Sequence, residues 1–396
     1  MQSVAGAKFY PQFLLTIRGK FYTFQDQSFS MRHEELVSVL ALQRVEGVGD
    51  AIAKKLMTHF GSATEIFSAN PRQLAEIGSI RPGIIRNFKD KSVFAKAEAE
   101  ARKIRDSGIK VTTFPDPDYP ERLRHCHDGP LLLFSSGNID LAGRKTLSIV
   151  GTRKATAYGA DFCRKLISDL AVLDPVIISG FAYGIDIIAH QAALENGLQT
   201  IAVLGSGLHD LYPKSHKKYV NAINDNGGFM TEFWSDVFPA PENFVRRNRI
   251  VAGISEATVI VESAERGGSL ITANLANDYN RDVFALPGRI SDPFSQGCNQ
   301  LIKTQRAHLL TGAADLLYIL NWDAKPSEKP VQKQLFVSLS DQEQKVYDYL
   351  IFRKKEQLDI IALENEMPVS KLASTLFAME LKGVVRPLPG KLFEAI

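Results

Sequence analysis

An alternation of strand and helix patterns from Thr146 to Gly288 constrains the fold of this chain more than any other feature. Apolar, β-branched runs at 146–151, 176–180 and 200–205 alternate with stretches of helical periodicity, each roughly 10 to 15 residues long as in βαβ units. Such units are right-handed and build sheets covered on both faces. We therefore predict an α/β domain with an extended Rossmann-like, doubly wound, mostly parallel sheet, whose ligand site lies beyond the carboxyl ends of its strands.

The stretch from 176 to 186, VIISGFAYGID, joins a strand to a helix through a turn that contains two glycines. The apolar run suits a strand buried on both faces, and Gly180 and Gly184 let backbone amides approach a phosphate at the helix N-terminus. The turn lacks the Gly-x-Gly-x-x-Gly fingerprint and the Gly-Lys-Ser/Thr ending of a Walker loop. It predicts an anion site but indicates neither a dinucleotide nor a nucleoside triphosphate. The bound phosphate can therefore belong to a polymer.

Further loops at the same predicted edge carry cations. Arg153 and Lys154 follow the strand that ends at Val150, where a guanidinium can hold a phosphate bidentately. Tyr212 comes shortly before two cationic residues, Lys214 and Lys218. An aromatic side chain among cations is typical of single-strand recognition. Taken alone, the same segment also fits a solvated helix start with a buried tyrosine.

An arginine cluster and a third glycine turn complete this edge. Residues 243–255, NFVRRNRIVAGIS, hold three arginines within four positions, and we expect them to have mixed roles, one pairing with Glu232 or Glu262. Residues 267–269, Gly-Gly-Ser, open a helix just past a strand and predict another nest of amides. Four such loops on one edge are far more specific than any one of them.

Bulk composition narrows the class of protein. The chain has 47 basic and 44 acidic residues in 396, and the net charge of +3 is too small to imply a nucleic-acid partner, so any electrostatic attraction must be local. Three widely spaced cysteines argue against a disulfide framework and suit a reducing, cytoplasmic compartment. No apolar run approaches the roughly 20 residues that span a bilayer, and the N-terminus is a poor signal peptide.

Length predicts two or three domains. Residues 1–33 are expected to be a flexible extension or to precede a true start at Met31, where a clear amphipathic helix begins. A Pro-rich segment from 111 to 134 is expected to be a connector that ends in an apolar strand. The predicted boundaries are 1–33 for the extension, 34–110 for a helical domain, 111–322 for the Rossmann-like domain, 323–335 for a polar linker and 336–396 for a winged helix.

Both smaller domains leave alternatives open. Residues 45–49, Val-Glu-Gly-Val-Gly, open a helix as in helix-hairpin-helix or SAM-like domains, where turn amides can bind a backbone phosphate beside Lys54 and Lys55. A helical packing module that uses Gly47 and Gly49 as caps fits equally well. In the winged helix, the third helix has Lys371 and Lys382 as its only bases. This small number of basic residues fits a protein partner or a structural role at least as well as it fits the binding of a DNA duplex.

Six motifs together resemble the DprA/Smf family of DNA-processing proteins of bacterial transformation. The resemblance is strong over roughly 35–310 and weaker in the winged helix. The motifs are SGFAYGIDIIAHQAAL at 179–194, TIAVLGSGLHDLYPKSH at 200–216, NFVRRNRIVAGISE at 243–256, GGSLITANLA at 267–276, VFALPG at 283–288 and GCNQLIK at 297–303.

The resemblance implies a homodimeric protein that binds single-stranded DNA, protects it and loads the RecA recombinase on it during natural transformation, with no cofactor and no metal. It places the strand-binding arginine at Arg153 and the strand-binding lysine at Lys214. It also places the candidate segments of the dimer interface around 285–310. Bases are expected to stack on Phe181 or Tyr212. The residues expected to contact DNA are Arg153, Lys154, Ser179, Gly180, Phe181, Gly184, Asp186, Tyr212, Lys214, Lys218, Arg247, Asn248, Arg249, Gly267, Gly268 and Ser269.

An enzyme is the alternative function. Glu262 beside the Gly267–Ser269 turn could attack or protonate an N-glycosidic bond in a nucleotide-processing hydrolase. Against this, no acid/base pair and no nucleophile elbow are evident, and the edge has more cations than a small nucleotide needs. We therefore predict a binding protein rather than an enzyme.

Overall fold

The computed structural model describes residues 15–17, 20–22, 33–78, 80–322, 339–388 and 391–395. Contacts divide the chain into two compact units, 1–325 and 326–396. The predicted linker at 323–335 lies outside the described residues. So does the predicted extension at 1–33, apart from His33 and the short antiparallel strands β1 (Leu15–Ile17) and β2 (Lys20–Tyr22).

A nine-stranded sheet forms the centre of the first unit, in the order β11-β10-β9-β5-β6-β7-β8-β4-β3. Pairing is parallel from β11 to β8, and β4 and β3 add an antiparallel edge. This confirms the predicted mostly parallel, doubly wound sheet. The strands are β3 (Lys110–Thr113), β4 (Leu132–Gly137), β5 (Thr146–Val150), β6 (Val176–Ser179), β7 (Thr200–Val203), β8 (Gly227–Thr231), β9 (Ala257–Ile260), β10 (Asp282–Ala285) and β11 (His308–Leu309).

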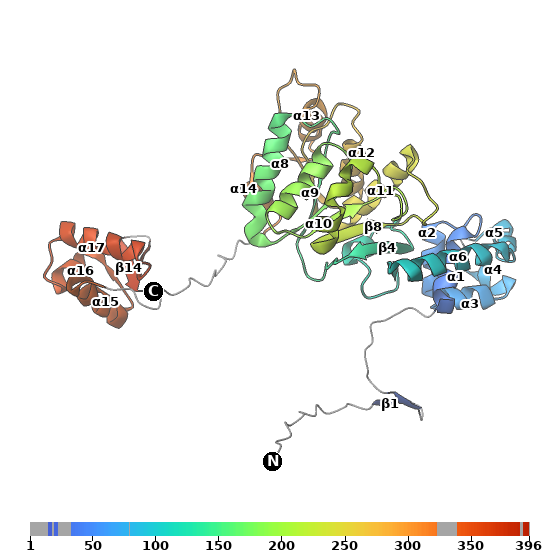
Figure 1. Cartoon of the computed structure of the whole chain (residues 1–396), viewed down its shortest axis with the longest axis horizontal. Helices are drawn as coiled ribbons and strands as arrows, with labels where there is room; N and C mark the ends of the chain where they lie inside the picture. Colours follow the sequence, from blue (N-terminus) through green and yellow to red (C-terminus); the bar gives the residue numbers. More distant parts are fainter. Residues whose placement is uncertain are drawn as a thin grey trace, which may run out of the picture. The chain divides into compact units, whose positions relative to one another are not determined.

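Helices cover both faces of this sheet (Figure 1). On one face lie α8 (Ala157–Leu170), α9 (Ile185–Glu195), α10 (Val220–Asp225) and α14 (Ala313–Ile319). On the other lie α7 (Glu121–Arg124), α11 (Pro241–Ile254), α12 (Ser269–Asp278) and α13 (Gln296–Lys303). Two 3₁₀ turns, η1 (Ala171–Leu173) and η2 (Lys214–Tyr219), join α8 to β6 and precede α10. Central strands are apolar throughout because they are buried on both faces.

The direction of winding reverses at β5. The chain builds β5, β6, β7 and β8 in one direction, then returns to place β9, β10 and β11 on the other side of β5. The carboxyl ends of β5 and β9 therefore diverge into opposite helical layers. Such a switch point opens a crevice at the edge of a doubly wound sheet.

The predicted connector at 111–134 is wrong at its start. Residues Lys110–Thr113 form β3 and pair antiparallel with β4 at the sheet edge. The β-branched residues Val111, Thr112 and Thr113 favour a strand, and prolines occur only between the two strands. The segment is thus a part of the sheet rather than a link to it.

A helical module, residues 33–108, packs against the β3–β4 edge (Figure 1). Its core includes Leu40, Leu56 and Ile66 and continues into Leu132 and Phe134 of β4. The capping box of Asn70 and Gln73 begins α4, and left-handed Gly61 and Gly108 end α2 and α6. The helices are α1 (His33–Arg44), α2 (Asp50–Phe60), α3 (Ala63–Ser68), α4 (Pro71–Glu76), α5 (Pro82–Asn87) and α6 (Ser92–Ser107).

The second unit has the predicted winged-helix architecture, three helices followed by a β-hairpin. Its core gathers Val346, Leu350, Leu372 and Met379. A third short strand, β12, pairs with β14. The elements are α15 (Asp341–Arg353), β12 (Lys355–Gln357), α16 (Leu358–Glu364), α17 (Val369–Leu381), β13 (Val385–Leu388) and β14 (Leu392–Ala395).

Candidate nucleic-acid interface

A pocket of about 620 Å³ opens at the switch point. Its floor comes from residues 150–153 after β5 and from Ser263 and Ala264 after β9, and its walls from α11 and the start of α12. It therefore lies at the edge that the sequence predicts. The predicted residues that line it are Arg153, Gly180, Asp186, Tyr212, Arg247, Asn248, Gly267, Gly268 and Ser269.

Arg247 is a buried cation in this lining, with 4% of its surface exposed. It donates a hydrogen bond to the carbonyl oxygen of Val203 at 2.7 Å, while its Nε has no hydrogen-bond partner among the described residues. Burial lowers the pKa of Arg247 to about 10, which leaves the guanidinium charged at neutral pH. A buried charge with a spare donor is costly unless an anion or water satisfies it. The pocket is thus suited to an anion.

The turn after β6 is shaped around this guanidinium. A Cβ at Gly180 would overlap the Arg247 guanidinium, and one at Gly184 would overlap the carbonyl oxygen of Thr152. Gly184 also has a φ of 76°, which favours glycine. The Asp186 carboxylate accepts from the amide of Ala182 at 3.3 Å, which supports the loop as predicted. Burial raises the pKa of Asp186, and the nearby charge of Arg247 opposes that rise.

Aromatic side chains lie beside the exposed cation of the pocket. The Arg153 guanidinium lies 5.6 Å from the centre of the Phe244 ring, and the rings of Phe244 and Tyr212 are 6.1 Å apart. Tyr212 is 46% exposed. Sequence reasoning missed Phe244, although its place three residues before Arg247 in the arginine motif sets it on the same helix face.

Phe181 does not have the predicted stacking role. Its side chain is fully buried and packs edge-on against Phe229 and His216. With a φ of 60°, the residue turns its ring inward rather than toward the pocket. The only base-stacking candidate of the prediction that the structure leaves exposed is Tyr212.

Amides at the start of α12 form the far wall. Gly267 packs so closely on Ser263 that a Cβ would overlap its hydroxyl, whereas an added Cβ at Gly268 would meet open space. The Ser269 hydroxyl donates to that of Ser263 at 2.9 Å. The turn predicted as an amide nest thus lines the same pocket as Arg247.

Seven predicted residues do not line the pocket. Ser179 is buried and donates to the carbonyl oxygen of Ile149, so its side chain is unavailable to a ligand. Exposed Lys214 and Lys218 lie on η2, just beyond Tyr212. The seven are Lys154, Ser179, Phe181, Gly184, Lys214, Lys218 and Arg249.

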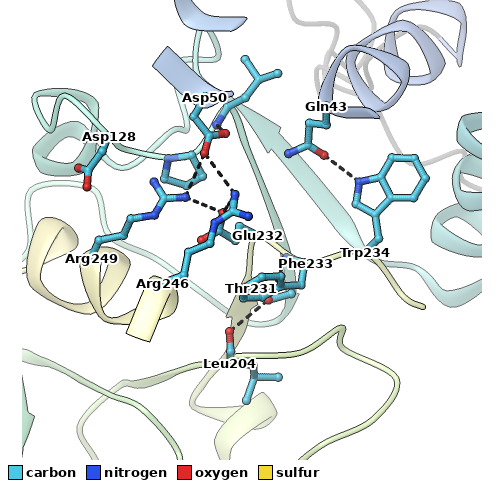
Figure 2. A network of polar contacts seen from close by, with 12 residues as sticks. Gln43, Asp50, Asp128, Leu204, Thr231, Glu232, Phe233, Trp234, Arg246 and Arg249 are labelled. Carbon is cyan, nitrogen blue, oxygen red and sulfur yellow. Dashed lines mark hydrogen bonds and ion pairs between the residues drawn. The ribbon is translucent and has the colours of Figure 1, made fainter. Parts of the chain in front are cut away.

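Arg249 is a correction, because it belongs to an ion network on the other side of α11 (Figure 2). One of its Nη atoms lies 2.5 Å from the Glu232 carboxylate and 3.1 Å from that of Asp50. Arg246 lies 2.6 Å from Glu232 and 3.3 Å from Asp50. The three arginines have mixed roles, as expected, but two of them pair with acids where one was predicted. Glu232, not Glu262, is the predicted partner that the structure shows, and of the three arginines Arg247 lines the pocket.

Part of the predicted helix-hairpin-helix site is engaged in contacts within the first unit. Asp50, the first residue of α2, accepts from the amide of Leu131 at 2.9 Å and faces Arg246 and Arg249. Lys54 is buried and donates to the carbonyl oxygen of Cys126 at 3.1 Å. Gly47 lies against Ile84. These contacts support a packing role, while Gly47, Gly49 and Lys55 are exposed and the DNA-binding hairpin stays a prediction.

Glu262 has a structural partner. Its buried carboxylate accepts hydrogen bonds from the amide and the hydroxyl of Thr156, the N-cap of α8. It does not line the pocket.

Among the described residues, no helix has the length and apolar character that crossing a bilayer requires.

Comparison with known proteins decides the family. The pattern of the DNA recombination-mediator protein A family matches residues 110–321, more than half of the chain. The chain belongs to the DprA/Smf family. The pattern of the DprA winged helix domain matches residues 330–391. The resemblance inferred from the six motifs is thus confirmed.

Two DprA/Smf relatives show how far the similarity extends. DNA processing protein DprA of Streptococcus pneumoniae is 42% identical over 202 residues, which are 51% of this chain and 71% of that protein. Protein Smf of Escherichia coli is 36% identical over 281 residues, 69% of this chain and 74% of its own. The X-ray structure of Streptococcus pneumoniae DprA has a TM-score of 0.63 at 32% identity, covering 73% of this chain and 98% of that one.

Proposed function

We propose that this protein binds single-stranded DNA in the switch-point pocket and, as a cytoplasmic homodimer, passes the strand to RecA during natural transformation. The observation that carries the proposal is Arg247, a buried guanidinium in a pocket walled by glycine turns, whose Nε finds no partner in the part of the chain that the structure describes. Such a site suits a phosphate that has left water. Family relatives named as DNA-processing proteins support a nucleic acid as its source.

A single strand fits better than a duplex for two reasons. Tyr212 and Phe244 place aromatic rings beside Arg153, and every unpaired base offers a face on which a ring can stack. Exposed Lys214, Lys217 and Lys218 extend the positive charge along η2 for neighbouring phosphates. Recognition is then weakly dependent on sequence.

Fluorescence anisotropy with labelled oligothymidine tests this proposal. We expect single strands to bind more tightly than duplexes, with affinity that falls as salt rises because counterions are released. Arg153→Ala and Lys214→Ala should each weaken binding and make it less salt-dependent, by about one unit of slope. Lys165→Ala is a matched control, because it removes one charge from exposed α8 outside the pocket. Unchanged affinity in both pocket variants would place the interface elsewhere.

The hydrolase alternative has its own test. We expect Glu262→Gln to leave single-strand affinity nearly unchanged and to lower the free energy of unfolding by about 1–3 kcal/mol. The reason is that the substitution weakens the buried hydrogen bonds that Glu262 accepts from Thr156, the N-cap of α8. Release of free base from nucleoside monophosphates by the unaltered protein, abolished in Glu262→Gln, would favour the enzyme instead.

The dimer and RecA steps need separate measurements. The segment proposed for dimerisation, around 285–310, is placed there by the family resemblance. A solution mass of the monomer alone at working concentration would contradict the dimer. RecA loading predicts faster RecA filament growth on oligothymidine already coated with single-strand-binding protein, and an unchanged rate would contradict it.

A further inference from the structure

Helix α11 contributes to two different environments at once. Phe244, Arg247 and Asn248 line the pocket. Arg246 and Arg249 instead bind Asp50 of α2 and Glu232 at the end of β8 (Figure 2). Asp50 of the helical module is therefore linked to the pocket lining through a single helix.

The ion network at this contact is balanced, because Arg246 and Arg249 face two carboxylates, those of Asp50 and Glu232. The side chains of Glu232 and Arg249 are 1% and 8% exposed, and Glu232 Oε1 and an Nη of Arg249 have no partner among the described residues. Without Asp50, the two guanidiniums would keep only Glu232 as an ion-pair partner among the described residues, with Asp128 nearby but outside ion-pair distance. Breaking a buried pair leaves an uncompensated charge, which forces neighbouring groups to move.

The helical module holds the chain at a second point just upstream of α11. The indole of Trp234 donates to Gln43 of α1 at 2.8 Å, and the amide of Ser235 donates to Glu100 of α6 at 2.7 Å. From there the chain runs through residues 239–241, which line the pocket, into α11. The module thus fixes both ends of a segment whose middle forms the pocket wall.

We propose that Asp50 is a positioning residue for DNA binding, and that the helical module sets the affinity of the pocket without touching DNA. Asp50 acts through Arg246 and Arg249, which orient α11 so that Arg247 lies under Gly180 and Phe244 beside Arg153. This inference rests on the proposed function, because the affinity that Asp50 controls is that of the pocket for a single strand.

Asp50→Asn tests the proposal on the full chain. Asparagine keeps an acceptor for the Leu131 amide and removes the charge that holds the arginines. We expect oligothymidine affinity about 3- to 30-fold weaker, the range of coupling between linked sites. The salt slope should stay that of the unaltered protein, since no phosphate contact is lost, whereas Arg153→Ala lowers it. If Asp50 only stabilises its local structure, a folded sample of Asp50→Asn should have the oligothymidine affinity and the salt slope of the unaltered protein.

Control variants keep the outcome interpretable. Asp118→Asn removes an exposed ion pair with Lys110, outside the contacts that hold α11 and the segment before it, and should bind as the unaltered protein does. Glu232→Gln should weaken binding like Asp50→Asn, and the double variant should lose little more, because both act through one network. Arg246→Gln, at a half-exposed position, gives a milder form if Asp50→Asn does not fold.

The two proposals fail in different ways. An unaltered protein that does not bind oligothymidine overturns the proposed function. If the unaltered protein binds, Arg153→Ala weakens binding, and folded Asp50→Asn and Arg246→Gln keep full affinity, only the positioning role of Asp50 is overturned.

Discussion

At the scale of single residues, the pocket depends on a close fit between one glycine and one arginine. Gly180 has an ordinary backbone conformation, so alanine is excluded there only by the Arg247 guanidinium beneath it. At Gly268, on the same pocket lining, an added methyl group would meet open space. The two glycines therefore separate the effect of moving Arg247 from the effect of crowding the pocket.

We expect Gly180→Ala to weaken single-strand binding by about tenfold or more, the loss expected when a charged hydrogen-bond donor is displaced. Gly268→Ala should change affinity less than about twofold. Anisotropy with oligothymidine measures both, and circular dichroism checks that both variants fold. Equal effects of the two substitutions would show that Arg247 does not bind the strand.

At the scale of secondary-structure elements, sequence periodicity predicted most of the fold. It placed β5, β6 and β7 within two residues, because buried parallel strands are apolar throughout. It could not assign the three arginines of α11 to their partners. Asp50 is nearly 200 positions away in sequence, and a helix with polar groups on two faces gives no single apolar stripe to fix its orientation. The predicted stacking role of Phe181 could not be checked from the sequence for a related reason. Its left-handed backbone conformation turns the ring inward, and the residue type alone does not indicate that conformation.

Helix α15 of the winged helix begins with a capping box that also contains an ion pair. The amide of Ser340 donates to Glu343 at 2.7 Å, and the Lys382 ammonium donates to the same carboxylate at 2.6 Å. The Lys382 hydrogen bond, followed by that of Ser340, lowers the pKa of Glu343 to about 2. Because the folded pKa lies below the unfolded one, this carboxylate stabilises the domain above about pH 4.5, and that stabilisation is lost as pH falls toward 2.

Glu343→Gln keeps the capping box and removes the charge. We expect it to lower the stability of the winged helix by about 1 kcal/mol at pH 7 and by much less near pH 2. Urea-dependent hydrogen exchange of peptides from 341–395, in the full chain, gives the free energy at each pH. A loss that is the same at both pH values would assign the effect to packing rather than to charge.

At the scale of the whole molecule, the two units differ in their suitability for DNA. Residues 339–395 carry nine acidic and eight basic side chains. On α17, which would enter a major groove, Phe377 is 61% exposed and Lys371 is an exposed cation. The switch-point pocket has buried Arg247, exposed Arg153 and neighbouring lysines. Single-strand affinity should therefore come from the first unit.

A chain that ends at Lys325, the boundary between the units, should bind oligothymidine with an affinity within about threefold of the full chain and with the same salt slope, since the slope counts phosphate contacts. Anisotropy at several salt concentrations compares the two. A slope that falls by two or more units on truncation would instead assign phosphate contacts to the winged helix.

The burial of Arg247 also has a kinetic consequence. Its guanidinium is already held by Val203 and by the fit under Gly180, so it gives up little side-chain entropy when a phosphate arrives. Exposed Lys214 attracts the strand from a distance but remains mobile until contact. Changes at Lys214 should act mainly on the rate at which DNA associates, and changes that move Arg247 on how long it stays bound. The time for which a strand stays bound would then be tuned at the buried arginine.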